Sequence, residues 1–328
     1  MADRRLFPWI VIAVTIAGII VPAITATGPG LTWLLFTGSS VHVAATFTLF
    51  AFKDVRRHAV ANPRRYVVAP LLLISTASAA AALLPSRALQ TALIGYFGWQ
   101  LWHYQQQNLG LAALTARATG RPPLTTTERR CIRAAAITGI LALAAHPQVA
   151  QLVDFHPPTA ATAAAQAVAW LLIAAALAVA ANQRRAATAT TVVLLLAVGF
   201  PLPLLMTTSP YTALGGMTLA HGLQYLLLVG LVLAGPNNRK SRAIEGTLLL
   251  TGVLAIAGAL AAASHLHHGP PATRLVFGAY LGIVMTHFVV DAGLWRLRDA
   301  FPRRWLGQRL PSLVNPAPHR LAIHRMPV

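Results

Sequence analysis

The sequence predicts an all-α membrane protein, a bundle of about ten transmembrane helices with both termini in the cytoplasm. Hydrophobic residues make up 56% of the 328 residues and charged residues only 10%, whereas a soluble domain carries about 25% charged residues. The apolar residues fall into ten runs, and roughly 20 apolar residues suffice to cross the hydrocarbon core as a helix. Basic residues gather in the short connections between these runs.

The ten runs lie near residues 7–27, 31–52, 67–85, 88–116, 131–151, 159–181, 186–206, 211–235, 243–264 and 272–295. The first run is too long for a cleavable signal peptide and leads directly into the second. The seventh run contains Gly199-Phe200-Pro201-Leu202-Pro203, which predicts a kink because each proline removes a backbone donor. We therefore expect one transmembrane domain over residues 1–298, followed by a basic, Pro-rich cytoplasmic tail over residues 299–328.

The distribution of charge predicts the orientation. When the N-terminus is placed in the cytoplasm, only Arg87 and Arg274 of the 26 Lys and Arg residues fall outside. The positive-inside rule therefore predicts a multi-pass protein of the cell membrane with cytoplasmic termini. The net charge of +19 then reflects topology and contact with anionic lipid. It does not indicate a nucleic-acid partner, because the basic residues are not clustered on a soluble face. The single cysteine, Cys131, excludes a disulfide-stapled secreted domain.

Four histidines lie deep within predicted helices, and polar residues at such depth are usually functional. They are His42, His103, His221 and His287, in the second, fourth, eighth and tenth runs. These even-numbered helices all run from outside to inside. At about 1.5 Å per residue, the depths of the four histidines agree within roughly 8 Å. We therefore expect four imidazoles near the middle of the bilayer.

Each histidine is followed one turn later by a hydrogen-bonding side chain on the same helix face. These four residues are Thr46, Gln107, Tyr225 and Asp291. Side chains of this kind could orient imidazoles as partners behind a metal ligand. Asp291 is the only carboxylate deep in any predicted span, so it could also offset the charge of a bound cation.

This combination predicts a metal centre. Neutral imidazole binds iron, copper or zinc, and three or four histidines leave coordination positions open for dioxygen or substrate. Apolar and aromatic walls would suit a lipophilic substrate that arrives from the bilayer. We expect Fe(II), with haem or copper as alternatives, and Tyr225 and Asp291 as the catalytic groups of a membrane oxygenase.

Three other interpretations remain open. In a proton-coupled transporter, His287 and Asp291 would form a relay. In a haem-binding electron-transfer protein, the histidines would be axial ligands. A single histidine in a membrane helix often only forms a hydrogen bond between helices, so structural polar packing is the third. The sequence gives no indication of the oligomeric state.

The motifs around the four histidines resemble those of the Brp/Blh family of bacterial membrane proteins, which includes β-carotene 15,15′-dioxygenases. Residues 41–46 are similar to its H-G-A-x-D motif, with Thr46 at the position of the acid. Residues 103–108 are similar to H-F-G-x-x-D, with Asn108 at the position of the acid. The match includes four of the ten predicted helices.

The other two motifs occur in the same order. Residues 221–225 are similar to H-x-x-x-H, with Tyr225 at the second histidine, and residues 286–291 are similar to a C-terminal motif of His followed by Asp. The resemblance implies a non-haem iron that cleaves a polyene with dioxygen, held by embedded histidines with Thr46 and Asn108 behind them. His287 is then the residue that could supply a fourth ligand where Tyr225 replaces a histidine.

Overall fold

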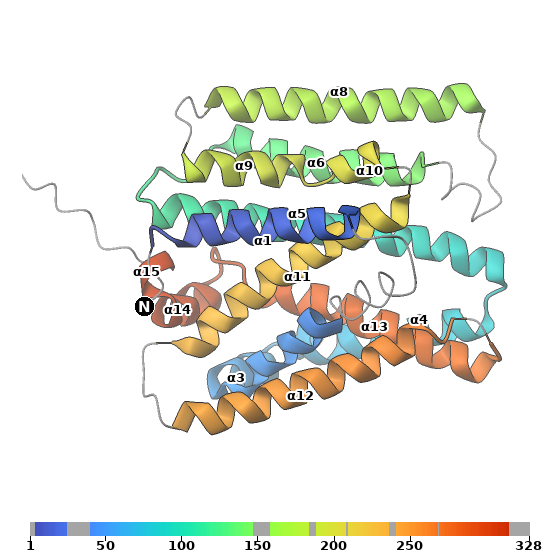
Figure 1. The fold of residues 1–328 in the computed structure, drawn as a ribbon. Coiled ribbons are helices and arrows are strands. Elements are labelled where there is room, and N and C mark those ends of the chain that lie inside the picture. Colours follow the sequence, from blue (N-terminus) through green and yellow to red (C-terminus); the bar gives the residue numbers. More distant parts are fainter. Residues whose placement is uncertain are drawn as a thin grey trace, which may run out of the picture.

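The computed structural model describes residues 4–24, 40–146, 158–183, 188–207, 209–235, 241–267 and 269–314, which are all-helical and contain no strand (Figure 1). The N-terminal half of the chain forms α1 (Phe7–Ile24), the short helix Ser40–Ala51 ending in η1 (Leu49–Ala51), α3 (Lys53–Ala61), the π-helical turn η2 (Arg64–Val68), α4 (Ala69–Leu83), α5 (Ser86–Ala118) and α6 (Thr126–Ala144).

The C-terminal half forms α8 (Thr159–Gln183), α9 (Ala189–Gly199), α10 (Leu202–Met206), α11 (Pro210–Ala234), α12 (Ser241–Ser264), α13 (Pro271–Leu294), α14 (Ala300–Arg309) and α15 (Pro311–Val314). Helices therefore occupy parts of all ten predicted runs. The kink predicted in the seventh run is confirmed, because α9 ends at Gly199 and α10 begins at Leu202.

Within the described residues, four helices are long and apolar enough to cross a membrane. They are Arg64–Leu83, Thr159–Asn182, Thr212–Ala234 and Pro271–Leu294. Shorter apolar helices occur at Phe7–Pro22, Ser40–Ala51, Ala189–Gly199 and Leu249–Ser264. The helices α5 and α6 are long but more polar, because α5 carries buried glutamines and α6 begins with a charged turn. The number of spans beyond these four, and the sides of the termini, stay predictions.

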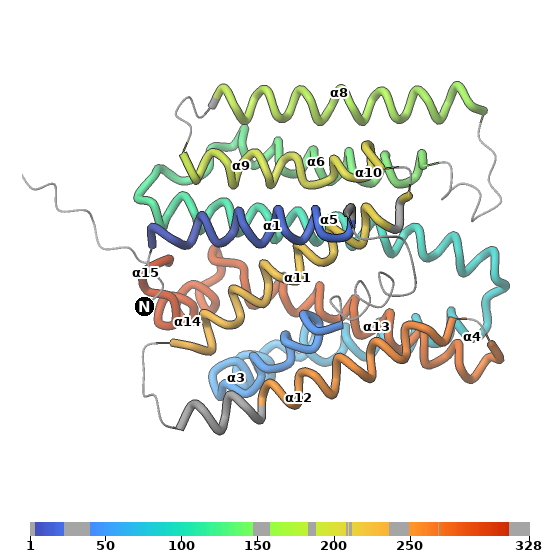
Figure 2. The backbone as a smooth tube through the Cα atoms, viewed as in Figure 1, coloured from blue at the N-terminus to red at the C-terminus, as the bar shows by residue number. Residues whose placement is uncertain are grey.

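The helices form layers (Figure 1). The helix α8 lies outermost on one side and packs on α6 and α9, which in turn contact α5. The helix α11 crosses obliquely against α1, while α13 packs along α4, with α12 beyond them. The tube in Figure 2 shows the start of α1, α3 and α14 at the same end of the bundle. Both α3 and α14 contain several basic residues.

The segment expected to be a cytoplasmic tail begins with packed helix. Within α14 and α15, Trp305 and Leu306 are 2% exposed and Leu313 is fully buried. These side chains join the main hydrophobic core. Residues 300–314 therefore close this end of the bundle, and residues 315–328 lie outside the described residues.

Glycines allow two pairs of helices to approach backbone to backbone. In α13, a Cβ atom on Gly282 would lie 2.9 Å from the backbone nitrogen of Ile74, and one on Gly278 would meet the backbone at Ala77 and Ser78 of α4. The two glycines are spaced as in the G-x-x-x-G motif of membrane helix pairs. In the same way, a Cβ on Gly216 of α11 would lie 3.1 Å from a carbonyl oxygen of α1.

We predict that Gly282→Ala destabilises the protein by about 1–3 kcal/mol, because the added methyl group overpacks a contact whose far side is backbone. The free energy of unfolding in mixed detergent micelles measures this. Gly252→Ala in α12 is the matched control, because a Cβ there meets nothing within 4 Å and alanine has the higher helix propensity. Equal stability of the two variants would contradict close α4–α13 packing.

Candidate metal centre

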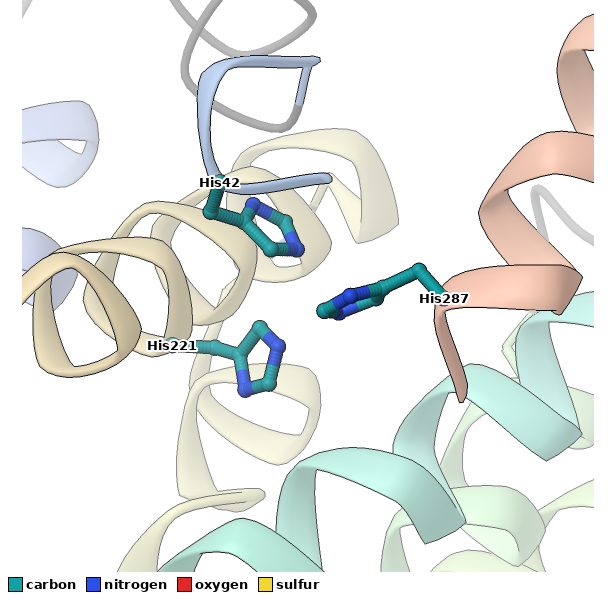
Figure 3. A group of neighbouring side chains, drawn as sticks. All are labelled: His42, His221 and His287. Atoms are coloured by element: carbon teal, nitrogen blue, oxygen red, sulfur yellow. The ribbon is translucent and has the colours of Figure 1, made fainter. Parts of the chain in front are cut away.

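Four histidines from four helical segments converge in the interior of the bundle. His42 comes from the short helix Ser40–Ala51, His103 from α5, His221 from α11 and His287 from α13. All four are buried, with relative exposures between 0% and 7%. Figure 3 shows His42, His221 and His287 pointing toward one another.

The ring distances define a compact cluster. The centroid of His42 lies 4.9 Å from that of His221 and 5.0 Å from that of His287. The centroid of His103 lies 4.9 Å from that of His221 and 5.1 Å from that of His287. His221 and His287 are 6.3 Å apart, so the four rings surround one small volume. One ring nitrogen from each of His42, His221 and His287 lies within 4.8 Å of the others.

Asp291 adds a carboxylate to this cluster. Its Oδ2 atom lies 3.5 Å from Nε2 of His287 and 3.9 Å from Nε2 of His103. These three residues form a second group whose ligand atoms all lie within 4.8 Å of one another. The two groups share His287, so together they make one site.

The nitrogen atoms of this cluster fit a metal ion. Nε2 of His103, both ring nitrogens of His221 and Nε2 of His287 are buried and have no hydrogen-bond partner within the described ranges. Buried polar atoms are normally hydrogen-bonded, because leaving them without a partner is costly. Neutral imidazole is a good ligand for iron, copper and zinc, and a metal ion would satisfy several of these atoms at once.

A chain of hydrogen bonds connects His287 to Asp291 through two other helices. The Thr46 hydroxyl lies 2.6 Å from Nδ1 of His287 and donates to the Tyr225 hydroxyl at 2.8 Å. The Tyr225 hydroxyl donates in turn to Oδ1 of Asp291 at 2.9 Å. The chain therefore joins the Ser40–Ala51 helix, α11 and α13 at the cluster.

The hydrogen bonds of this chain bear on the tautomer of His287. A hydroxyl group has only one proton to donate, and Thr46 has three neighbouring acceptors: the Tyr225 hydroxyl, Nδ1 of His287 and, at 3.5 Å, the backbone oxygen of His42. When the Thr46 proton is directed to Tyr225 or His42, its oxygen accepts from Nδ1–H of His287. Nε2 of His287 then carries the lone pair that a metal ion would bind.

Two other residues expected behind the ligands lie beside the cluster but form different bonds. Gln107 donates to the backbone oxygen of His221 at 3.0 Å and to Oε1 of Gln224 at 2.9 Å. Asn108 donates to Oε1 of Gln105 at 2.9 Å. Gln107 thus connects α5 to the backbone of α11 at His221. Thr46 likewise bonds the ring of His287 on another helix.

Two aromatic residues at the cluster were not singled out from the sequence. The ring of Phe288 stacks on His103 at 4.3 Å, and the ring of Tyr104 lies 4.4 Å from that of His221. Both directly follow a histidine of the cluster in sequence. A neighbour in sequence points to a different side of the helix, so a pattern along one helix face does not include them. The repeated His-aromatic pair was the available signal.

Comparisons with known protein families, with curated proteins and with solved structures found no match. Function is therefore inferred from the geometry of the cluster.

We predict that Thr46→Val, which replaces the hydroxyl with a methyl group of similar size, destabilises the fold by about 1–3 kcal/mol. The change leaves Nδ1 of His287 without this partner in a buried place and removes one of the two hydrogen bonds of the Tyr225 hydroxyl, which keeps its bond to Asp291. Thr46→Ser is the matched control, because it keeps the hydroxyl. Unfolding in mixed micelles distinguishes them, and a serine variant as unstable as the valine variant would contradict this role for the hydroxyl.

Proposed function

We propose that this chain is a multi-pass membrane oxidoreductase of the oxygenase type, in which His42, His103, His221 and His287 hold a non-haem iron. The observation that carries the proposal is the convergence of four buried imidazoles, with centroid distances of 4.9–5.1 Å around the cluster. The orphaned nitrogen atoms of three of these rings support it further. Both termini are proposed to be cytoplasmic, with about ten spans.

The protein's own residues would have distinct tasks. The histidines would bind the metal as neutral ligands, and Asp291 would balance its charge at close range. Thr46 and Tyr225 would be positioning residues, because their hydroxyl groups connect Nδ1 of His287 to Asp291. Iron would supply the one-electron and dioxygen chemistry that side chains lack. Copper is the alternative metal, since imidazole also suits it.

The proposed substrate is a lipophilic molecule, isoprenoid or polyene in character, that reacts with dioxygen. The cluster lies among apolar helices, and Phe288 stacks on His103, so the surroundings favour a substrate from the bilayer over a polar one. The resemblance to the Brp/Blh motifs supports a polyene in particular. Exclusion of water by these helices would protect reactive species formed during oxidation.

Two alternative functions make different demands on the cluster. Haem would require a gap as wide as a macrocycle between two axial histidines. Here His42 and His103 each lie close to both His221 and His287, which disfavours that gap. Proton-coupled transport would use His287 and Asp291 as a relay, and the bonded chain through Tyr225 and Thr46 is the observation in its favour.

We predict near-stoichiometric iron in protein purified from iron-replete cells in mild detergent, without the Soret absorption of haem. His103→Ala should lose most of this iron, because it removes one of the proposed ligands. His146→Ala, at a histidine outside the cluster, is the control and should keep the iron. Elemental analysis together with an absorption spectrum provides the measurement.

The same preparation discriminates among the alternatives. Copper in place of iron would change the metal but keep the site, and a Soret band would indicate haem. Protein without metal, even after reconstitution, would overturn the metal proposal. In that case Asp291→Asn should abolish proton-coupled transport in vesicles if the chain is a transporter.

A further inference from the structure

A second polar region lies at the end of the bundle formed by α3, η2 and α14. A cavity of about 780 Å³ opens there between these elements and the end of α13. Its lining includes His58, Arg64, Arg65, Tyr66 and Phe301. None of these residues belongs to the metal centre, so a ligand in this cavity would be independent of the proposed function.

The charge of this cavity favours an anion. Arg64 and Arg65 both line it and form no ion pair within the described part of the chain. The one carboxylate in the lining, Asp299, lies 3.8 Å from Arg298. The planar guanidinium group binds two oxygens of a phosphate at once, so two adjacent arginines suit a phosphate group.

The walls add further groups that fit such a ligand. The Tyr66 hydroxyl is buried beside the Arg65 side chain, from which its oxygen accepts, and its own proton has no acceptor among the described residues. His58 stacks on Phe301 with ring centroids 4.0 Å apart and planes at 4°. Burial, together with the nearby Arg65, lowers the pKa of His58 below its usual value. The positive charge of the cavity therefore comes from the arginines.

The local backbone explains why these groups meet. The helix α3 ends at Ala61, and the π-helical turn η2 redirects the chain into α4. A Cβ atom on Gly293 of α13 would lie 2.9 Å from the side chain of Arg65 and would also clash with the Tyr66 hydroxyl. Glycine at this position therefore leaves the space that Arg65 and Tyr66 occupy. Turns of the π type occur frequently at functional sites.

The helix that leaves the cavity is exposed and apolar. Val67 and Val68 are each 47% exposed, and Leu71 and Leu72 are 60% and 61% exposed. They come shortly after Arg64 and Arg65 in the candidate span Arg64–Leu83. A ligand in this place would therefore meet a cationic cavity at one end and an apolar helix face at the other. This is the pattern of a phospholipid with a charged headgroup.

We propose that this cavity binds the phosphate of an anionic phospholipid, with the acyl chains along the exposed face of α4. Basic pockets between membrane helices on the cytoplasmic side bind anionic headgroups in this way. Free inorganic phosphate offers the same group without the chains, and the experiment distinguishes the two ligands.

The test uses the full chain, purified in detergent and freed of lipid, and native mass spectrometry. The protein is titrated with phosphatidylglycerol, with phosphatidylcholine and with inorganic phosphate. Phosphatidylglycerol is expected to bind best. The double variant Arg64→Gln/Arg65→Gln should weaken this binding by about tenfold or more, because both guanidinium groups contribute.

The matched control is Arg130→Gln/Arg133→Gln, which removes the same charge from exposed positions of α6. It should leave the affinity for phosphatidylglycerol within about twofold, because neither residue lines the cavity. Equal losses in the two double variants would overturn the proposal in favour of diffuse charge attraction. Equal binding of the two lipids by the unmodified protein would overturn it as well.

A milder variant covers the case in which the double variant does not fold. Tyr66→Phe keeps both arginines and removes only the buried hydroxyl, and it should weaken phosphatidylglycerol binding by several-fold. Unchanged affinity in this variant would contradict the site. A further outcome is that inorganic phosphate binds as tightly as the lipid, with the same dependence on Arg64 and Arg65. This result would overturn the lipid proposal and identify the ligand as a free anion.

Discussion

The cost of burying polar groups among apolar helices is the constraint on which this structure depends. Four imidazoles and the Asp291 carboxylate are buried in the bundle, so each needs a partner. Hydrogen bonds between helices provide part of the solution, since Thr46 and Tyr225 join His287 to Asp291. The nitrogen atoms of the cluster that have no hydrogen-bond partner among the described residues belong to His103, His221 and His287. A bound cation would provide a partner for ring nitrogens that form no hydrogen bond.

The four histidine rings can meet because the backbones of neighbouring helices pack closely. Rings can surround a small volume only if the helices that carry them lie near one another, and glycine allows that approach. The close-contact glycine of α13, Gly282, lies less than two turns before His287, and Gly216 of α11 stands in the same relation to His221. The partner helices α4 and α1 therefore help to position His287 and His221 without contributing a histidine to the cluster themselves.

The positions of the helices and the four histidines of the cluster could be predicted from the sequence. The hydrogen bonds between helices could not, because they depend on how each helix is rotated about its axis. Apolar run length predicted helices in all ten places, and proline chemistry predicted the break between α9 and α10. Matched depth singled out the four histidines that converge. Sequence could not reveal that Thr46 bonds His287 on another helix, because the relative rotation of two membrane helices is determined by packing over their whole length. For the same reason Gln107 was expected to contact a histidine ring, whereas it donates a hydrogen bond to the backbone oxygen of His221 in α11.

Two of the three positions at which this chain differs from the resembled motifs, Thr46 and Tyr225, are in contact with each other. Thr46 replaces an acid in the first motif, Tyr225 replaces a histidine in the third, and their hydroxyl groups form a hydrogen bond of 2.8 Å. An acid and a histidine in contact would form a charged or strongly polar pair, whereas Thr46 and Tyr225 form a neutral one. The neutral pair connects His287 to Asp291 through a continuous chain of hydrogen bonds. In this chain the two hydroxyl groups work as one unit, because removal of either would leave a buried polar group without its partner, which costs about 1–3 kcal/mol.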